Sequence, residues 1–427
     1  MTRGSAVRRS TGALALPVMA ALIALGLTAC DVPVAAAPVP TPTQTPVVPY
    51  GDGVLRIGGL VPTTGASAGL SAAQVAGIEL AVREIDEAGG YGGVPVQVFH
   101  RDVGEPGSGV LAASFAELVA KGVDVVVGPS DPSLAAELVP LATAARIPVI
   151  SPDAGAMDAA ELDSGGYLFR LASGPGILAA AVTELVGSAT MSVAAVDDGF
   201  GAGVITAITD DRAAAGLDPV VSAVTASGTS AVKAAADVAA GDPDYVVVAA
   251  AAGASSTTEA LVASLLDQGV VASQLVLVGD GVLDLSVLSP AGELEGARAL
   301  TAGAPLDDGF RARLLSADPG VTDFRFAAES YDAVMLAALA ARVAGDDGGE
   351  SIARAIPGVS SDWVTCSSFA ECAQVLGSED DIDYQGVSGA VDLDDSGDLV
   401  AGTVSSWLYG ADGRAAIGDI LRVSTRP

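Results

Sequence analysis

The sequence has 427 residues, with 20 Lys and Arg against 52 Asp and Glu, which gives a formal net charge of −32. This length predicts two or three globular domains, because a domain commonly spans roughly 100–200 residues. Such an acidic surface repels phosphate backbones, which disfavours nucleic-acid binding. A single histidine and three cysteines disfavour a multi-ligand zinc site and a Ser-His-Asp triad. The composition therefore favours a binding protein over an enzyme.

The first thirty residues have the order of charges that is typical of an export signal. Three arginines precede an apolar run over residues 13–27, which is shorter than the roughly 20 residues of a membrane span. The run ends in a Leu-Thr-Ala-Cys sequence that resembles the bacterial lipobox. We therefore expect residues 1–29 to be a signal peptide and Cys30 to receive a lipid. The alternatives are an ordinary signal peptide that ends near a cysteine, or a buried cysteine.

Residues 30–50 are rich in proline, which disfavours both helices and sheet ladders and favours an extended chain. We expect this segment to be a lipidated tether that holds a globular body outside the cell membrane.

From residue 54 onwards, short apolar segments alternate with amphipathic segments. The apolar segments predict strands, and apolar residues at i, i+3, i+4 and i+7 predict helices. The predicted strands are 54–60, 94–100, 123–127, 147–150, 193–196, 220–224, 245–250 and 275–278. The predicted helices are 71–88, 108–120, 133–145, 177–185, 201–214, 231–240, 257–268 and 327–344. Ser71 and Gln74 match a capping box at the start of the first helix.

This alternation predicts an α/β fold with two doubly wound parallel-sheet lobes joined by a hinge. Strands such as 123–127 and 245–248 are almost continuously apolar, which suits parallel strands covered on both faces. Ligands of such sheets bind beyond the carboxyl ends of the strands. The predicted binding loops are 61–71, 128–133, 151–156, 197–203, 251–256 and 279–283. The apolar segment 327–344 predicts a buried core helix rather than a membrane span.

Several short motifs resemble those of the type I periplasmic binding proteins, in particular the leucine/isoleucine/valine-binding branch that serves ABC importers. The motifs are Pro62-Thr63-Thr64-Gly65, Val127-Gly128-Pro129, Ile147-Pro148-Val149-Ile150-Ser151-Pro152, Tyr167-Leu168-Phe169-Arg170, Ser330-Tyr331-Asp332-Ala333-Val334 and Asp383-Tyr384-Gln385-Gly386-Val387. The resemblance implies that a small ligand docks on one lobe and that the other lobe closes over it. It also implies a membrane permease as the partner, with no cofactor and no metal.

The resemblance implies how the chain divides into lobes. The first lobe would comprise residues 54–172 plus about 300–385, and the second would comprise 173–299 plus about 386–427.

The resemblance also implies which first-lobe residues contact the ligand. Ser130 and Ser133 fall in the loop that binds the ligand carboxylate in the family, although Ser133 could merely cap the following helix. Gly155 stands where the family has a threonine, so only backbone amides could serve there. Asp153 is a departure from the family that would repel a carboxylate if it pointed inward.

In the second lobe, Phe200 matches an aromatic wall of the cleft, and Asp280 matches an acid that pairs with a ligand ammonium. The alternative for Asp280 is a turn-forming Asp-Gly pair. The family tends to have aromatic residues where Leu70 and Ala251 or Ala252 stand, which predicts a roomier and less polar pocket.

Other motifs predict structure rather than chemistry. Cys366 and Cys372 form an even pair in an exported chain and predict a disulfide. The Asp-rich segment 392–398 is similar to the start of a calcium loop, but it lacks the glutamate that an EF-hand requires at its twelfth position. A polar turn between two strands explains it better. Residues 65–69 match a Gly-x-Ser-x-Gly string, which we interpret as a loop at the rim of the cleft.

Together these features predict a non-enzymatic, lipid-anchored solute-binding protein outside the cell membrane, which captures an amino-acid-like or amide ligand for an ABC importer. The alternative is a ligand-sensing or surface interaction lipoprotein with the same fold and no role in transport.

Overall fold

The computed structural model describes residues 50–153, 164–251, 255–282, 285, 292–361, 363–379 and 381–425. The predicted signal peptide, Cys30, the tether up to residue 49 and Gly155 lie outside the described residues.

The first sheet contains five strands in the order β2-β1-β3-β4-β5, and every neighbouring pair is parallel. The strands are β1 (Arg56–Val61), β2 (Gln97–Asp102), β3 (Val125–Val127), β4 (Val149–Ser151) and β5 (Leu168–Arg170). The chain winds in opposite directions on the two sides of β1, so the loops after β1 and β3 diverge. A ligand crevice forms at such a switch point, beyond the carboxyl ends of the strands.

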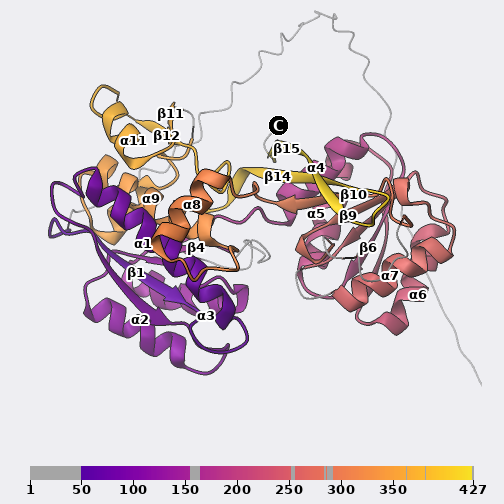
Figure 1. Ribbon diagram of the computed structural model, residues 1–427, viewed down its shortest axis with the longest axis horizontal. Helices are drawn as coiled ribbons and strands as arrows, with labels where there is room; N and C mark the ends of the chain where they lie inside the picture. Colours follow the sequence, from indigo (N-terminus) through magenta and orange to yellow (C-terminus); the bar gives the residue numbers. More distant parts are fainter. Residues whose placement is uncertain are drawn as a thin grey trace, which may run out of the picture. The chain divides into compact units, whose positions relative to one another are not determined.

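Helices cover both faces of this sheet (Figure 1). On one face, α1 (Ser71–Glu87) packs against α9 (Ala327–Ala344). On the other face, α2 (Val110–Ala120) and α3 (Pro132–Ala145) complete a separate apolar cluster. The remaining helices are α8 (Asp308–Ala317) and α10 (Gly349–Ala355). The parallel, doubly covered sheet confirms what the apolar strands predict.

The second sheet has the order β13-β14-β10-β9-β8-β6-β7, with β15 paired to β14. Its parallel strands are β6 (Met191–Val196), β7 (Val221–Thr225), β8 (Tyr245–Ala249), β9 (Leu275–Val278) and β10 (Arg298–Ala302). Its antiparallel strands are β13 (Asp392–Leu393), β14 (Leu399–Tyr409) and β15 (Ala415–Ser424). The core of the sheet is parallel, as the sequence predicts, and the hairpin strands of the C-terminal segment add an antiparallel edge.

Two pairs of helices cover the second sheet. One apolar cluster joins it to α4 (Pro175–Val186) and α5 (Phe200–Ala214). Another joins it to α6 (Gly228–Ala239) and α7 (Ser255–Asp267). Each sheet thus has its own core, which confirms a two-lobed α/β fold.

Helix α9 is buried along most of its length, as the sequence predicts, and it carries a buried acid. Asp332 is fully buried, and its carboxylate accepts hydrogen bonds from the Tyr384 hydroxyl at 2.7 Å, the Val387 N–H at 3.0 Å and both the N–H and the hydroxyl of Ser388 at 2.8 and 2.6 Å. These bonds fix the segment that leaves the first lobe for strand β13. Among the described helices, none has a long enough apolar stretch to span a bilayer.

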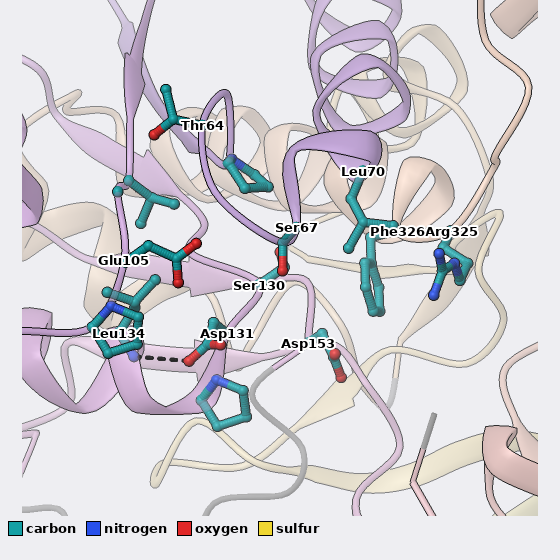
Figure 2. A pocket seen from close by; sticks show the side chains of 15 residues that line it. Thr64, Ser67, Leu70, Glu105, Ser130, Asp131, Leu134, Asp153, Arg325 and Phe326 are labelled. Atoms are coloured by element: carbon teal, nitrogen blue, oxygen red, sulfur yellow. Dashed lines mark hydrogen bonds between the residues drawn. The ribbon is translucent and has the colours of Figure 1, made fainter. Parts of the chain in front are cut away.

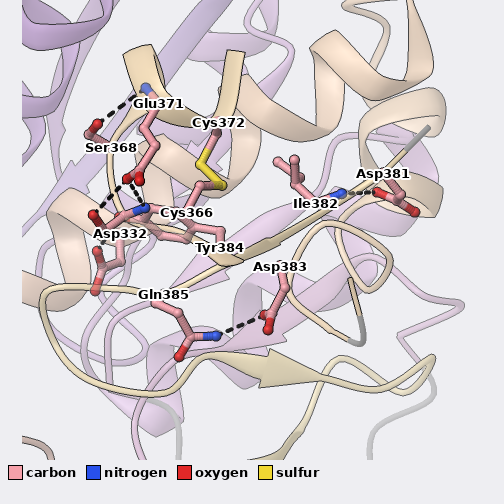
Figure 3. Close-up of a disulfide and its surroundings, with 11 residues drawn as sticks. Asp332, Cys366, Ser368, Glu371, Cys372, Asp381, Ile382, Asp383, Tyr384 and Gln385 are labelled. Atoms are coloured by element: carbon pink, nitrogen blue, oxygen red, sulfur yellow. Dashed lines mark hydrogen bonds between the residues drawn. A yellow bond between two sulfur atoms is a disulfide. The ribbon is translucent and has the colours of Figure 1, made fainter. Parts of the chain in front are cut away.

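A small two-stranded sheet, made of β11 (Val364–Cys366) and β12 (Ile382–Tyr384), lies beside α11 (Phe369–Val375). Cys366 and Cys372 form a disulfide here, which confirms that prediction (Figure 3). Strand β12 ends at Tyr384, whose hydroxyl bonds to Asp332.

The Asp-rich segment forms the turn between β13 and β14. The Asp394 carboxylate accepts hydrogen bonds from the Ser396 N–H at 2.9 Å and from the Asp398 N–H at 3.2 Å. Asp398 also pairs with Arg170 at the end of β5. Because the turn uses these carboxylates itself, a polar hairpin turn explains the segment, as expected.

The expected helix cap at Ser71 and the alternative cap at Ser133 are both wrong. Ser71 is the first residue of α1, and its side chain caps nothing, because Leu70 occupies the cap position. Helix α3 begins one residue earlier than predicted, at Pro132, and its cap is Asp131 rather than Ser133.

Candidate functional site

Two adjoining cavities lie at the carboxyl ends of the strands. The first has a volume of about 280 Å³ and is lined by first-lobe loops, including Thr64, Ser67, Leu70, Glu105, Ser130 and Asp131 (Figure 2). The second has a volume of about 340 Å³ and is lined by residues that include Leu178, Asp198, Phe200, Ala251, Gly279, Asp280 and Glu329. Both cavities share Pro132, Asp153, Arg325 and Phe326.

The lining of the second cavity comes from both lobes. Asp153 follows β4 of the first sheet, whereas Phe200 follows β6 and Asp280 follows β9 of the second sheet. The predicted loops after parallel strands therefore do meet around one cavity. Its volume suits a small molecule of the size that protein clefts usually hold.

The structure brings four of the six predicted contact residues to these cavities. Ser130 lines the first cavity, Asp153 lines both, and Phe200 and Asp280 line the second. Ser133 has an exposed side chain and lines neither. Gly155 lies outside the described residues.

The N-terminus of α3 is occupied by a carboxylate of the chain itself. Asp131 accepts hydrogen bonds from the Ser133 N–H at 2.8 Å and from the Leu134 N–H at 3.1 Å (Figure 2). Pro132, the first residue of the helix, has no N–H to offer. The free N–H groups that would attract a ligand carboxylate at this helix end are thus largely used by Asp131.

Ser130 belongs to a second polar contact below the cavity. Its hydroxyl oxygen accepts a hydrogen bond of 2.9 Å from the side-chain N–H of Gln74, which is 1% exposed. Gln74 therefore braces the loop after β3 instead of closing a capping box on its own helix.

A glycine after β9 makes room for the aromatic wall. Gly279 has φ +98°, and a Cβ atom there would lie 2.6 Å from the Phe200 ring and 2.5 Å from the Ala250 carbonyl oxygen. Any larger residue would displace Phe200 from the cavity.

Comparisons with known proteins identify the family. The family model described as periplasmic binding protein matches residues 54–370. The chain belongs to the periplasmic binding protein family. Proteins of this family bind substrates and are not enzymes, in agreement with the prediction from composition. No curated protein matches the chain in sequence.

Solved structures share the type I fold. The substrate-binding protein LivJ of a branched-chain amino acid transporter from Streptococcus pneumoniae, in complex with isoleucine, is 21% identical with a TM-score of 0.60, over 87% of this chain and 99% of that chain. A binding protein from R. palustris in complex with 4-hydroxybenzoate is 18% identical with a TM-score of 0.61, and the match covers 88% of this chain and 98% of that chain. A putative branched-chain amino acid ABC transporter protein from Rhodospirillum rubrum is 18% identical with a TM-score of 0.64, and the match covers 85% of this chain and 100% of that chain.

The cavities of this binding protein are acidic. Six lining residues are acids and one is a base. Backbone N–H groups bond to three of these acids. The Ala66 N–H donates to Glu105, and the N–H groups of Gly201 and Ala251 donate to Asp198. Asp131 accepts from the first N–H groups of α3. Asp153, Asp280 and Glu329 form no hydrogen bond or ion pair with any other described residue, although the backbone of Glu329 bonds to its own carboxylate.

The electrostatic environment of these three acids follows from their position. Burial, and then the charges of Asp280 and Glu329, raise the pKa of Asp153 well above its usual range. Burial, and then the charges of Asp332 and Asp280, raise the pKa of Glu329 to about 7. Asp280 is accessible to solvent from the cavity, but the surrounding protein still desolvates it and raises its pKa, against the charge of Arg325. The charge of Arg325 partly opposes the rise at Asp153 and Asp280, but Arg325 forms no ion pair with either carboxylate, and Glu329 has no basic partner among the described residues.

Sequence reasoning missed Arg325, Phe326 and Glu329. Arg325 and Phe326 precede α9 in a segment with no strand pattern, and Phe326 has a positive φ of 62°. Glu329 did carry a signal, because it is an acid in the first turn of an otherwise apolar helix.

Proposed function

We propose that this is an extracytoplasmic solute-binding protein that captures a small amino-acid-like or amide ligand between its two lobes for an ABC importer. One observation carries the proposal. A cavity of about 340 Å³ is lined by loops that follow the parallel strands of both sheets. A ligand in that position would bridge the two lobes, and its binding would favour their closure.

The proposed contacts divide between the lobes. Ser130 and Asp153 would contact the ligand from the first lobe, and Phe200 and Asp280 from the second. Ser133 and Gly155 remain predictions from the family resemblance. The proposed lobe boundaries are those predicted from the sequence, with residues 173–299 and about 386–427 forming the second lobe.

A screen by thermal shift tests the capture of a small molecule. Amino acids, amino-acid amides, amines and aromatic acids should include a compound that raises the melting temperature. At 100 times its Kd, a ligand adds about 2.7 kcal/mol to the free energy of unfolding. Phe200→Ala should lower the affinity for that ligand. Tyr50→Phe should leave the affinity unchanged, because Tyr50 lies outside both cavities. If no compound of any class produces a shift, the proposed function fails.

We also propose that Cys30 carries a lipid that anchors the protein to the outer face of the cell membrane, with residues 30–50 as the tether. The lipobox-like sequence at residues 27–30 supports this proposal. Cys30→Ser should move the protein from the membrane fraction to the soluble fraction on fractionation of expressing cells. Retention of the serine variant in the membrane fraction would contradict the anchor.

A further inference from the structure

The charge of the two cavities restricts the ligand that they can hold. The carboxylates of Asp153, Asp280 and Glu329 face the second cavity without a hydrogen-bond or ion-pair partner among the other described residues. An ionised group without a partner costs free energy when it is removed from water. A guest with a positive charge would supply the missing partner to each of them.

The one basic residue of the lining forms no ion pair with these acids, and its charge only partly opposes the raised pKa of Asp153 and Asp280. Arg325 forms a two-pronged ion pair with Asp323, with its Nε 3.1 and 3.0 Å from the two carboxylate oxygens and its Nη2 2.5 Å from one of them. Its charge is therefore already balanced by an acid outside the lining. A ligand carboxylate would find no unpaired base there.

The helix end where a carboxylate could bind is also taken, because Asp131 holds the first N–H groups of α3. At that helix end, a ligand carboxylate would have to displace a carboxylate of the protein while it approached Asp153. Both steps are unfavourable, because like charges repel at short range. The Ser130 hydroxyl accepts from Gln74, and its O–H can still donate to a neutral ligand oxygen.

Much of the rest of the second cavity is apolar, although Ser173, Ser388 and Thr403 also line it. Leu171, Leu178 and Ala302 contribute aliphatic surface, and Phe200 and Phe326 contribute aromatic rings. Aliphatic surface buries the apolar part of a guest, and the face of an aromatic ring also attracts a cation.

We propose that the ligand of this protein is a small organic cation with an apolar body and no carboxylate, such as an alkylamine or the amide of a branched-chain amino acid, whose ammonium group pairs with Asp153, Asp280 and Glu329. This inference rests on the proposed function and narrows its substrate class.

Matched ligands test this inference directly. Leucine and leucinamide differ only in that an amide replaces the carboxylate. By isothermal titration calorimetry on the mature protein at pH 7, where most of the leucinamide still carries its ammonium charge, we expect leucinamide to bind at least 10-fold more tightly than leucine. The uncharged control 4-methylpentanamide, which lacks the ammonium group, should bind more weakly than leucinamide. The aromatic acid 4-hydroxybenzoate should not bind.

Matched variants test which residues are responsible. Glu329→Gln and Asp280→Asn should each lower the affinity for leucinamide at least 10-fold, because each removes one unpaired negative charge from the cavity. Glu117→Gln removes the same charge from an exposed position beside Arg101, with 2.7 Å between Nε and the carboxylate oxygen, and should change the affinity less than twofold. This control separates a local contact from the overall acidity of the protein.

The outcomes separate the inference from the proposed function. If leucine or 4-hydroxybenzoate binds as tightly as leucinamide, the cleft is a ligand site and the charge inference is wrong. Binding of leucinamide that neither cavity variant weakens would also overturn the inference. If no compound binds, the proposed function and the inference fail together.

Discussion

Helix α9 carries two acids one turn apart, and they lie in opposite surroundings. Around Asp332, four donors from residues 384–388 converge on one carboxylate. Around Glu329, three residues earlier, the carboxylate faces the second cavity and no other described residue bonds to it. Burial raises the pKa of both groups; at Asp332 hydrogen bonds from Tyr384, Val387 and Ser388 oppose that rise, whereas at Glu329 only a hydrogen bond from its own backbone does so.

The comparison shows how one helix serves structure and binding. The donors to Asp332 come from the end of β12 and the segment that leads to the second sheet, and we call Asp332 with residues 384–388 the joint. The region of Glu329 instead has space for a guest in place of donors. An acid with its own donors stabilises the fold, whereas an acid without them is available to a ligand.

The strongest test of this comparison removes the charge at the joint. Asp332→Asn should lower the free energy of unfolding by about 3 kcal/mol or more, because a donor amide would then face the donors of Ser388 and Val387 and leave buried groups unpaired. Urea denaturation followed by circular dichroism measures the loss. Glu329→Gln is the matched neutralisation on the same helix and should cause no loss. Equal losses in the two variants would contradict the distinction.

The disulfide gives a second, smaller test of the same joint. Cys366 and Tyr384 are directly paired across β11 and β12, so the disulfide stabilises the strand that supplies one donor to Asp332 (Figure 3). Replacing both cysteines by alanine should cost about 2 kcal/mol on the loop-entropy model. In the absence of reductant, denaturation of the variant and the parent measures this cost. Under reducing conditions the difference should shrink, and a difference that stayed constant would show that side-chain packing is responsible instead.

Much of the fold can be predicted from the sequence, because its strands are apolar on both faces and regularly spaced. Strand β9 matches its predicted range, and α9 lies where its apolar residues indicate. The short strand β5 and the mixed edge of the second sheet are harder to predict. Three residues carry too little periodicity to identify a strand, and the pairing of β14 with β10 joins residues about a hundred positions apart.

The candidate site is less predictable, for a physical reason. Loops that follow parallel strands can be located by pattern, and the family resemblance indicates Asp153, Phe200 and Asp280 within those loops. Whether a helix end or a hydroxyl is available to a ligand depends on contacts within the fold. Asp131 precedes Ser133 in the sequence, but only the structure shows that its carboxylate occupies the helix end.

The smallest expected effect concerns the stability of the cavity side of α9 without ligand. The pKa of Glu329 is raised from 4.5 in a model peptide to about 7 in the folded protein, so between these pH values the native state holds a proton that the unfolded chain has released. Stability from this group is therefore complete below about pH 4.5 and is lost as the pH rises through about 7.

Glu329→Gln should remove that loss. At pH 8 we expect the free energy of unfolding of the variant to exceed that of the parent by about 1 kcal/mol or less after screening by solvent. The variant should therefore melt at a higher temperature, and this gain should disappear near pH 4.5. Calorimetric melting temperatures of both proteins across this range measure the difference, from which the acids distant from Glu329 cancel. A variant that is less stable than the parent at pH 8 would mean that Glu329 contributes to the fold as Asp332 does, and that the two regions of α9 are alike.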